Sequence, residues 1–169
     1  MDFVGPYIGT AAQPQGVAPS PPPLQGQVAV STPVSTNGSY TAAFDSNHFC
    51  LWGKQLAQDA ELIQEMVATY QPDCLLVELG FNDLGWFVSD EAGTIASMVT
   101  FIANARAAKH DIKFAIANIP HRTSLGSVNP NLDAKTTNYN NLLAAAIPGW
   151  STTESPVALV DFAGAYDCS

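Results

Sequence analysis

Two patterns alternate along residues 56–161, and this alternation constrains the fold more than any other feature of the chain. Apolar residues at helical spacing predict helices over residues 56–70, 89–105 and 134–147. Apolar runs of strand length occupy residues 74–79, 112–117 and 156–161. Because these runs are almost continuously hydrophobic, we expect parallel strands that are covered on both faces. Strands that alternate with helices predict a layered α/β fold with a parallel sheet.

Particular residues define the ends and the buried sides of these elements. Pro72 is expected to stop the first helix and Ser89 to cap the second. Cys74, within an apolar run, is expected to be a buried small residue. The residues expected to face the core are, helix by helix, Leu56, Ala60, Ile63, Val67 and Tyr70; Ile95, Met98, Val99, Ile102 and Ala105; and Tyr139, Leu142, Leu143 and Ile147.

The first quarter of the chain has a different composition. Residues 10–43 are rich in Pro, Ser, Thr, Gly and Gln, which predicts an extended surface loop. Residues 3–4, ahead of this loop, are expected to end a short strand. The length of 169 residues fits a single domain over residues 1–169, with no boundary after residue 44.

Composition argues against several kinds of partner. The chain has 6 Lys and Arg against 15 Asp and Glu, a formal charge of −9, which disfavours nucleic acid and anionic membranes. No apolar run approaches the roughly 20 residues of a membrane span, and no signal peptide is visible at the N-terminus. The spacing of the three cysteines fits no zinc or redox motif. Because their number is odd, at least one is free or has lost its partner, and Cys168 is the candidate for a partner beyond the present C-terminus.

The residues that follow the predicted strands are the candidates for chemistry, because ligands bind at the carboxyl ends of strands in open α/β sheets. Gly80 lets the chain turn tightly, and Asn82 can donate an uncharged hydrogen bond to an oxyanion. Asp83 can hold the loop by accepting backbone N–H groups. Residues 80–83 alone fit a plain strand-to-helix turn somewhat better than a functional site, because Asn and Asp are good turn formers. Asn118, with His121 shortly after it, and Asp161 follow the other two strands.

The surrounding residues resemble a known family. Tyr-Gln-Pro-Asp at 70–73, the apolar strand and Gly-Phe-Asn-Asp at 80–83 resemble the third block of the SGNH (GDSL-type) hydrolases. His-Phe-Cys-Leu-Trp-Gly at 48–53 resembles the second block, in which Gly53 matches the glycine that gives an oxyanion-hole N–H. Residues 104–106, 139–143 and 155–161 also resemble this family, and residues 2–5 look like its second strand. The likeness covers about residues 44–167 and is greatest to fungal secreted members related to carbohydrate esterase family 3.

The resemblance implies a fold, an activity and a location. The fold would be a flavodoxin-like three-layer sandwich, and the activity would be hydrolysis of acetyl or short-acyl esters, possibly on carbohydrate. Asn82 and the Gly53 N–H would form the oxyanion hole, with Gly80 and Asp83 in support. No metal or organic cofactor is implied, the full-length protein would be secreted, and the oligomeric state stays open.

The family's nucleophile and histidine have no matching positions. The sequence contains no Gly-Asp-Ser segment, and no Asp-x-x-His segment follows the last predicted strand. We therefore expect the chain to lack the family's first strand and C-terminal helix, to fold marginally, and to be of uncertain activity. Asp45 and His48 have the Asp-x-x-His spacing but precede the strands. His121 and Ser124 form a weak candidate pair, in which His121 more plausibly lines the crevice.

Two other functions fit parts of the sequence. A non-catalytic domain could bind carbohydrate or a partner chain through exposed aromatic rings, although most of these rings are expected in the core. The rings are those of Trp52, Phe81, Trp86, Phe87 and Trp150. A flavin-binding flavodoxin is disfavoured because no phosphate-cradling loop follows a first strand.

Overall fold

The computed structural model describes residues 3–8, 47–50, 53–121 and 129–166. The chain divides into two compact units, Met1–Gly53 and Lys54–Ser169. The loop predicted at residues 10–43, together with Asp45, Trp52, Ser124 and Cys168, lies outside the described residues. The prediction of a single domain stays a prediction.

The first unit contains one short antiparallel pair of strands. β1 (Tyr7–Ile8) pairs with β2 (Asn47–His48), and Tyr7 lies opposite His48. The strand expected to end at residues 3–4 is not found, because these residues have no regular structure. Residues 5–6 form a bend, and Pro6 has no N–H to give to a ladder, so pairing begins after them.

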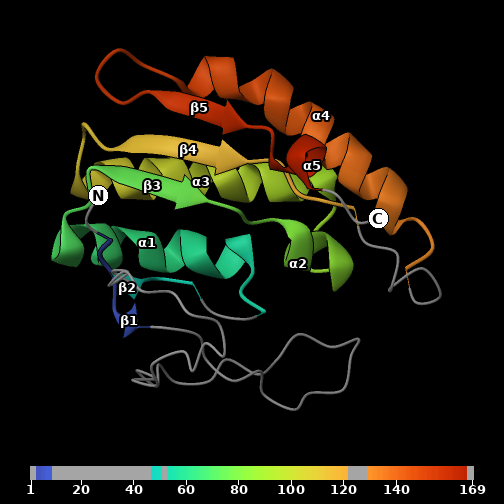
Figure 1. The fold of residues 1–169 in the computed structure, drawn as a ribbon, viewed down its shortest axis with the longest axis horizontal. Helices are drawn as coiled ribbons and strands as arrows, with labels where there is room; N and C mark the ends of the chain where they lie inside the picture. The colour runs from blue at the N-terminus through green and yellow to red at the C-terminus, as the bar shows by residue number, and fades with distance from the viewer. Residues whose placement is uncertain (1–2, 9–46, 51–52, 122–128, 167–169) are drawn as a thin grey trace, which may run out of the picture. The chain divides into compact units, whose positions relative to one another are not determined.

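The second unit is built on a three-stranded parallel sheet. Its strands β3 (Cys74–Val77), β4 (Lys113–Ala117) and β5 (Val157–Val160) lie side by side in that order (Figure 1). The long helices are α1 (Leu56–Tyr70), α3 (Glu91–Ala108) and α4 (Leu132–Trp150). Two short helices, α2 (Phe81–Gly85) and α5 (Phe162–Ala165), follow β3 and β5. The predicted α/β fold with a parallel sheet is confirmed.

Helix ends agree with the sequence in part. Gln71 takes a left-handed conformation just before Pro72 and closes α1 as expected. The cap of α3 is Asp90, whose carboxylate accepts the Gly93 N–H at 2.7 Å, so the prediction of Ser89 was wrong by one residue. Ser89 instead exchanges a hydrogen bond with Thr94 at 2.7 Å. A carboxylate stabilises this helix end more than a hydroxyl does, because its negative charge also interacts favourably with the positive end of the helix dipole.

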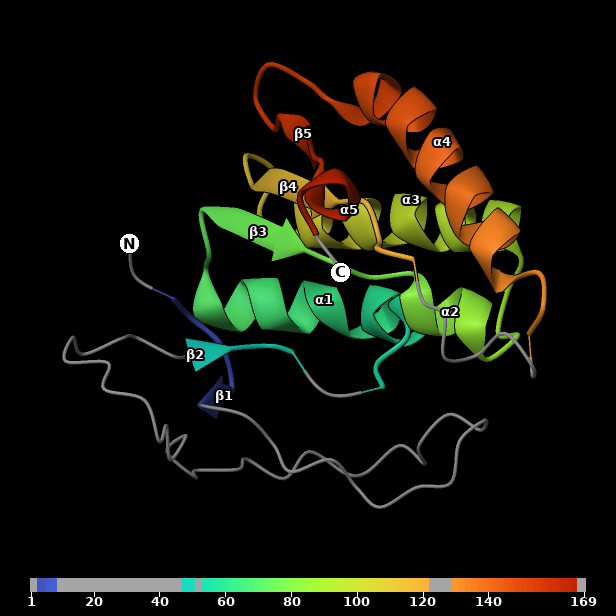
Figure 2. The same ribbon diagram turned by 45° about the vertical axis from the view of Figure 1, so that its right-hand side comes forward.

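All three long helices cover the same face of the sheet. Right-handed connections through α3 and α4 place both helices on one side when the strands follow in the order β3, β4, β5. Figures 1 and 2 show α1 on that side as well. The core between helices and sheet includes the buried side chains of Val77, Phe114, Ile116 and Val157.

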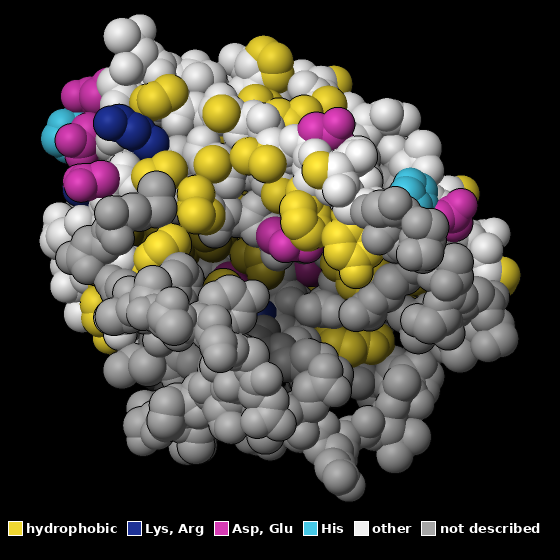
Figure 3. Space-filling view, in the orientation of Figure 1, with side chains coloured by type: hydrophobic (Ala, Val, Ile, Leu, Met, Phe, Trp, Pro, Cys, Tyr) yellow, Lys and Arg dark blue, Asp and Glu magenta, His cyan; other side chains and the backbone are white. Residues whose placement is uncertain are grey.

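The opposite face of the sheet is open, which corrects the expectation of burial on both faces. Leu76 is 63% exposed, Val160 is 44% exposed, and Cys74 is exposed rather than buried. Figure 3 shows hydrophobic side chains over the sheet in the view of Figure 1. The physical reason is that none of the long helices in the described part of the chain lies over this face. A third layer is therefore not seen among the described residues.

The predicted core stripes are mostly correct. Leu56, Ala60, Ile63 and Val67 are buried, and so are Met98, Ile102, Ala105, Tyr139, Leu143 and Ile147. Tyr70 and Ile95 are half-buried, and Val99 of α3 and Leu142 of α4 are exposed, whereas Phe101 of α3 is buried. Val99 and Leu142 are each adjacent in sequence to a buried residue, which turns their side chains about 100° away around the helix. No helix in the described part of the chain is long and apolar enough to span a membrane.

Candidate functional site

Gly80 forms a tight turn between β3 and α2. Its φ of +110° is unfavourable for other residues. A Cβ atom here would also lie 2.8 Å from the hydroxyl oxygen of Tyr139. That hydroxyl donates to the carbonyl of Leu79 at 3.2 Å. Burial raises the pKa of Tyr139, so the ring stays a neutral donor beneath the turn.

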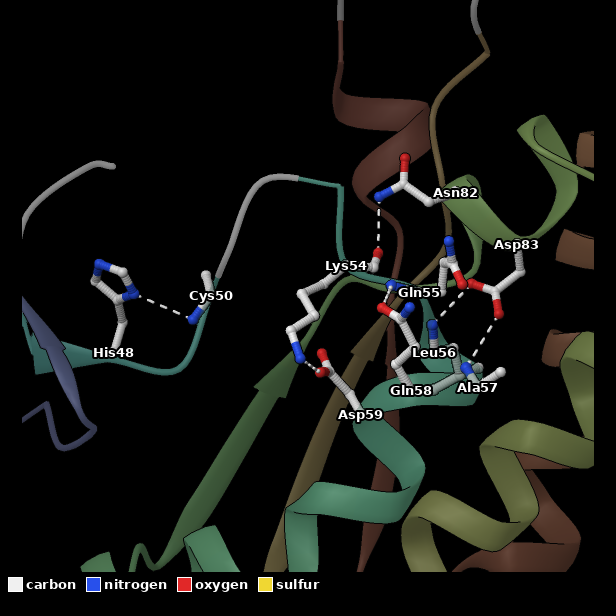
Figure 4. A network of polar contacts seen from close by, with 10 residues as sticks. All are labelled: His48, Cys50, Lys54, Gln55, Leu56, Ala57, Gln58, Asp59, Asn82 and Asp83. Atoms are coloured by element: carbon white, nitrogen blue, oxygen red, sulfur yellow. Dashed lines mark hydrogen bonds and ion pairs between the residues drawn. The ribbon is translucent and has the colours of Figure 1, made fainter. Parts of the chain in front are cut away.

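Asn82 lies in the first turn of α2, directly after the carboxyl end of β3. Its Nδ2 donates to the backbone carbonyl of Lys54 at 2.7 Å (Figure 4). Because only the amide nitrogen can donate to a carbonyl, this bond fixes the orientation of the side chain. The second N–H of the amide has no partner among the residues that the structure describes, so it can donate to a ligand.

Asp83 joins α2 to the start of α1. Its two carboxylate oxygens accept the backbone N–H groups of Leu56 at 2.8 Å and Ala57 at 3.0 Å. Its backbone carbonyl accepts the N–H of Val88 at 2.9 Å. The sequence predicted that Asp83 would hold its own loop, whereas the carboxylate binds a helix 26–27 residues earlier. Burial raises the pKa of Asp83 more than these backbone bonds lower it.

A buried acidic residue lies close to these groups. Asp59 is 4% exposed, and its Oδ1 lies 3.2 Å from the ammonium nitrogen of Lys54. The contact is an ion pair without good hydrogen-bond alignment, since this oxygen accepts no hydrogen bond within the described residues. Burial therefore dominates and raises the pKa of Asp59 to about 6, against the opposing effect of Lys54. Nearby Asp83 adds to the increase.

The sequence analysis did not single out Lys54 and Asp59. A signal was present, because Asp59 falls between Leu56 and Ile63 on the apolar stripe of α1. A carboxylate at such a position is buried and needs a partner. Lys54 is close enough in sequence to reach it, as the structure shows.

Polar groups also meet at the ends of β4 and β5. The side-chain amide of Asn118 donates to Asp161 at 2.8 Å, and its carbonyl oxygen accepts the N–H of Ala163 at 2.7 Å. The hydrogen bond from Asn118 lowers the pKa of Asp161. After β3, burial raises the pKa of Glu78. Within the described residues, no group of three or more His, Cys, Asp or Glu side chains could hold a metal.

The remaining candidates are less closely connected. His121 is exposed and pairs through Nδ1 with the carboxylate of Asp133, and among the described residues no hydrogen bond joins it to residues 80–83. Gly53 is a buried turn residue with φ +77°, but it belongs to the first unit, so its predicted role beside Asn82 stays a prediction. In that unit, His48 accepts the backbone N–H of Cys50 at 3.1 Å.

Four of the aromatic side chains that were candidates for ligand stacking are at least partly exposed. Phe87 is 58% exposed, and Phe81, Trp86 and Trp150 are partly exposed, so the expectation of burial was wrong for these four. They lie on the short α2, in the turn after it and at the last residue of α4. The Lys135 ammonium lies 5.2 Å from the centre of the Phe87 ring.

Two solved structures are similar to this chain. One is an acetyl esterase that carries a serine-to-alanine substitution and binds an acetate ion, and the other is a carbohydrate esterase of family 3 from Talaromyces cellulolyticus. Each is 30% identical, has a TM-score of 0.61 and matches 75% of this chain. The chain has the fold of an SGNH-type esterase.

The similarity to these esterases covers only part of their length. The match covers 58% of each esterase chain, so this chain spans a little over half of their length. The chain matches no protein-family model and no curated protein. The resemblance inferred from residues 70–84 thus agrees with the structural neighbours in fold and in esterase type.

Proposed function

We propose that this chain provides the oxyanion-binding part of an ester hydrolase that acts on acetyl or other short-acyl esters, including those on carbohydrate. The observation that carries the proposal is the anchored amide of Asn82, with one N–H bound to Lys54 and one left to donate. It lies just after the carboxyl end of β3, where ligands bind in sheets of this kind. The acetyl esterase and family 3 carbohydrate esterase similar to this chain support the substrate class.

The chemistry follows from charge development in the reaction. When a serine hydroxyl adds to an ester carbonyl, the carbonyl oxygen becomes a tetrahedral oxyanion. A preorganised donor stabilises this oxygen more than the neutral ester, and removal of one such donor typically lowers kcat by about 10²–10³-fold. Asn82 would supply one donor and the Gly53 N–H another. The sequence contains no Gly-Asp-Ser segment, so the proposal assigns no nucleophile to this chain.

The surroundings of Asn82 favour this role over that of a simple turn residue. Asp83 fixes α2 to the start of α1, and Tyr139 supports the turn at Gly80 from below. A turn alone needs neither a carboxylate bound to a distant helix nor a tyrosine against its glycine. These contacts restrict the position of Asn82 before any ligand arrives, which an oxyanion donor requires.

Methanesulfonate can test this proposal, because it is a tetrahedral anion with a methyl group like the adduct of an acetyl ester. We expect it to shift the side-chain amide signals of Asn82 in an NMR titration. Asn82→Ala should weaken binding by about fivefold or more, the value of one hydrogen bond. Asn141→Ala, an exposed asparagine on α4, is the matched control and should leave binding unchanged. Equal binding by all three proteins would overturn the proposal.

An activity assay separates binding from turnover. We expect no hydrolysis of p-nitrophenyl acetate above background by the chain or by Asn82→Ala. Turnover that falls in the Asn82 variant would show that the chain has a nucleophile of its own, which would correct the assignment above. His121 would then be the first base to substitute.

We also propose that the protein is secreted, on the basis of its few charged residues, its Ser, Thr and Pro content and its esterase neighbours. Detection of the native protein in the culture medium would support this location. Its retention in the cell fraction would contradict it.

A further inference from the structure

Lys54 connects the buried Asp59 to the candidate oxyanion donor. Its ammonium lies 3.2 Å from Asp59, and its backbone carbonyl accepts the amide of Asn82 at 2.7 Å (Figure 4). The side chains of Lys54 and Asp59 are only 12% and 6% exposed. An ion pair at this depth is poorly screened by salt. The residue that orients Asn82 is therefore itself held at its side-chain end.

The position of Asp59 is not explained by stability. Burial of its carboxylate disfavours the ionised form, and the ion pair with Lys54 does not compensate fully. An apolar residue would fit the stripe of α1 between Leu56 and Ile63 at lower cost. Groups kept at a cost in stability are frequent at functional sites.

We propose that Asp59 is a positioning residue for Asn82, which holds Lys54 by its ammonium so that the Lys54 carbonyl keeps the Asn82 amide directed for oxyanion binding. This inference rests on the proposed function. It predicts that the site binds an oxyanion better while Asp59 is ionised, because protonation removes the charge attraction between Asp59 and Lys54.

The charged neighbours of Asp59 determine the expected pH profile. Within the described residues, it faces Lys54 from the segment before α1 and Asp83 from α2, and Asp83 in turn faces Tyr139 of α4. Burial raises the pKa of Asp59 to about 6, so the carboxylate takes up a proton as the pH falls from 8 to 5. General electrostatics predicts the opposite effect on ligand binding, since a chain of net charge −9 attracts an anion more strongly as it loses negative charge.

Methanesulfonate affinity as a function of pH tests the inference, because the charge of this probe does not change between pH 5 and 8. For the unmodified chain we expect affinity to fall by about fivefold from pH 8 to pH 5. This factor corresponds to the net free energy of one hydrogen bond. The midpoint should lie near the pKa of Asp59. In the free protein, the side-chain amide signals of Asn82 should shift with the same midpoint. A profile that is flat or rises toward low pH would overturn the inference.

Variants separate positioning from a merely structural role. Asp59→Asn and Lys54→Gln should each weaken binding at pH 8 and abolish the fall in affinity toward low pH, and the double variant should resemble either one, because the two residues act as a pair. Asp73→Asn breaks a surface ion pair with Lys109 and is the matched control, which should keep the profile of the unmodified chain. If Asp59→Asn does not fold, the pH profile and Lys54→Gln still decide the question.

The outcomes distinguish this inference from the function on which it rests. If Asn82→Ala binds methanesulfonate as well as the unmodified chain, the proposed oxyanion site is wrong. If Asn82→Ala weakens binding while Asp59→Asn and Lys54→Gln keep affinity and pH profile, the site stands and the role of Asp59 is wrong.

Discussion

The carboxylate of Asp83 lies 2.8 Å from the backbone nitrogen of Leu56 and accepts its N–H. Gln55 and Gln58 form a capping box at the start of α1, and the carboxylate of Asp83 from α2 accepts the N–H groups of Leu56 and Ala57 there. The helix that carries Asp59 and the turn that carries Asn82 are thereby joined. Stability and site geometry should therefore respond together to changes at Asp83.

Asp83→Ala should lower the free energy of unfolding by about 2–4 kcal/mol, because it leaves two N–H groups at the start of α1 without an acceptor. Urea unfolding measures the loss. Asp90→Ala removes the exposed cap of α3 and should cost about 1 kcal/mol. Equal losses in the free energy of unfolding would show that the buried contact of Asp83 with α1 stabilises the chain no more than the exposed cap of α3 does.

Gly80→Ala should be destabilising by about 1–3 kcal/mol, since alanine is strained at positive φ. Its Cβ would also approach the Tyr139 hydroxyl at 2.8 Å. Gly149→Ala is the control: this glycine lies in α4 with no atom within 4 Å of an added Cβ. It should stabilise the chain by about 0.5–1 kcal/mol, the helical preference for alanine. A tolerated Gly80→Ala would contradict the close packing of Tyr139 beneath the turn.

Stability should rise as the pH falls from 7 toward 4. Burial raises the pKa of Asp59 from 3.8 to about 6, so in this window the folded chain binds a proton that the unfolded chain does not. The gain begins as the pH falls through the folded pKa and is complete below the unfolded pKa, and it amounts to about 2–3 kcal/mol. Asp83 and Glu78, whose pKa values are also raised, add in the same direction.

Thermal unfolding across this pH range measures the effect, and Asp59→Asn should remove most of it. A stability that falls from pH 7 to pH 5 in the unmodified chain would contradict the buried state of Asp59. The same change of pH should weaken oxyanion binding, so stability and binding should move in opposite directions.

The open face of the sheet should make the chain prone to self-association. Leu76→Gln and Val160→Gln should reduce light scattering and the binding of a hydrophobic dye, with unfolding free energies changed by less than about 1 kcal/mol, because both side chains are exposed. Ile116→Gln, on the covered face of β4, should instead unfold the chain. Unchanged scattering in the first two variants would show that association uses another surface.

The sequence was a good guide where structure depends on local spacing. The stripe from Leu56 to Val67 predicts α1 with correct ends, since helical periodicity and Pro72 are local signals. It was a poor guide where burial depends on distant elements. Leu76 and Cys74 belong to an apolar run of a kind usually covered on both faces, but no long helix in the described part of the chain covers theirs.

The candidate site was predictable to a similar extent. Residues 80–83 follow an apolar strand, and this position together with the family resemblance of the surrounding residues indicated Asn82. The partners of the site were not predictable, because Lys54 and Asp83 lie 28 and 26–27 residues from the groups they contact. Short-range rules do not indicate which backbone N–H groups a buried carboxylate will bind. The pair of Asp59 and Lys54 is different, because Asp59 interrupts the apolar stripe of α1 and Lys54 is near it in sequence.

A crystal structure of the chain with methanesulfonate tests the central claim most directly. The account predicts a sulfonate oxygen at about 2.7–3.1 Å from Nδ2 of Asn82, the range for an oxyanion donor, with the bond from Asn82 to the Lys54 carbonyl retained. An anion bound elsewhere, or an Asn82 amide whose two N–H groups are both engaged within the protein, would contradict it.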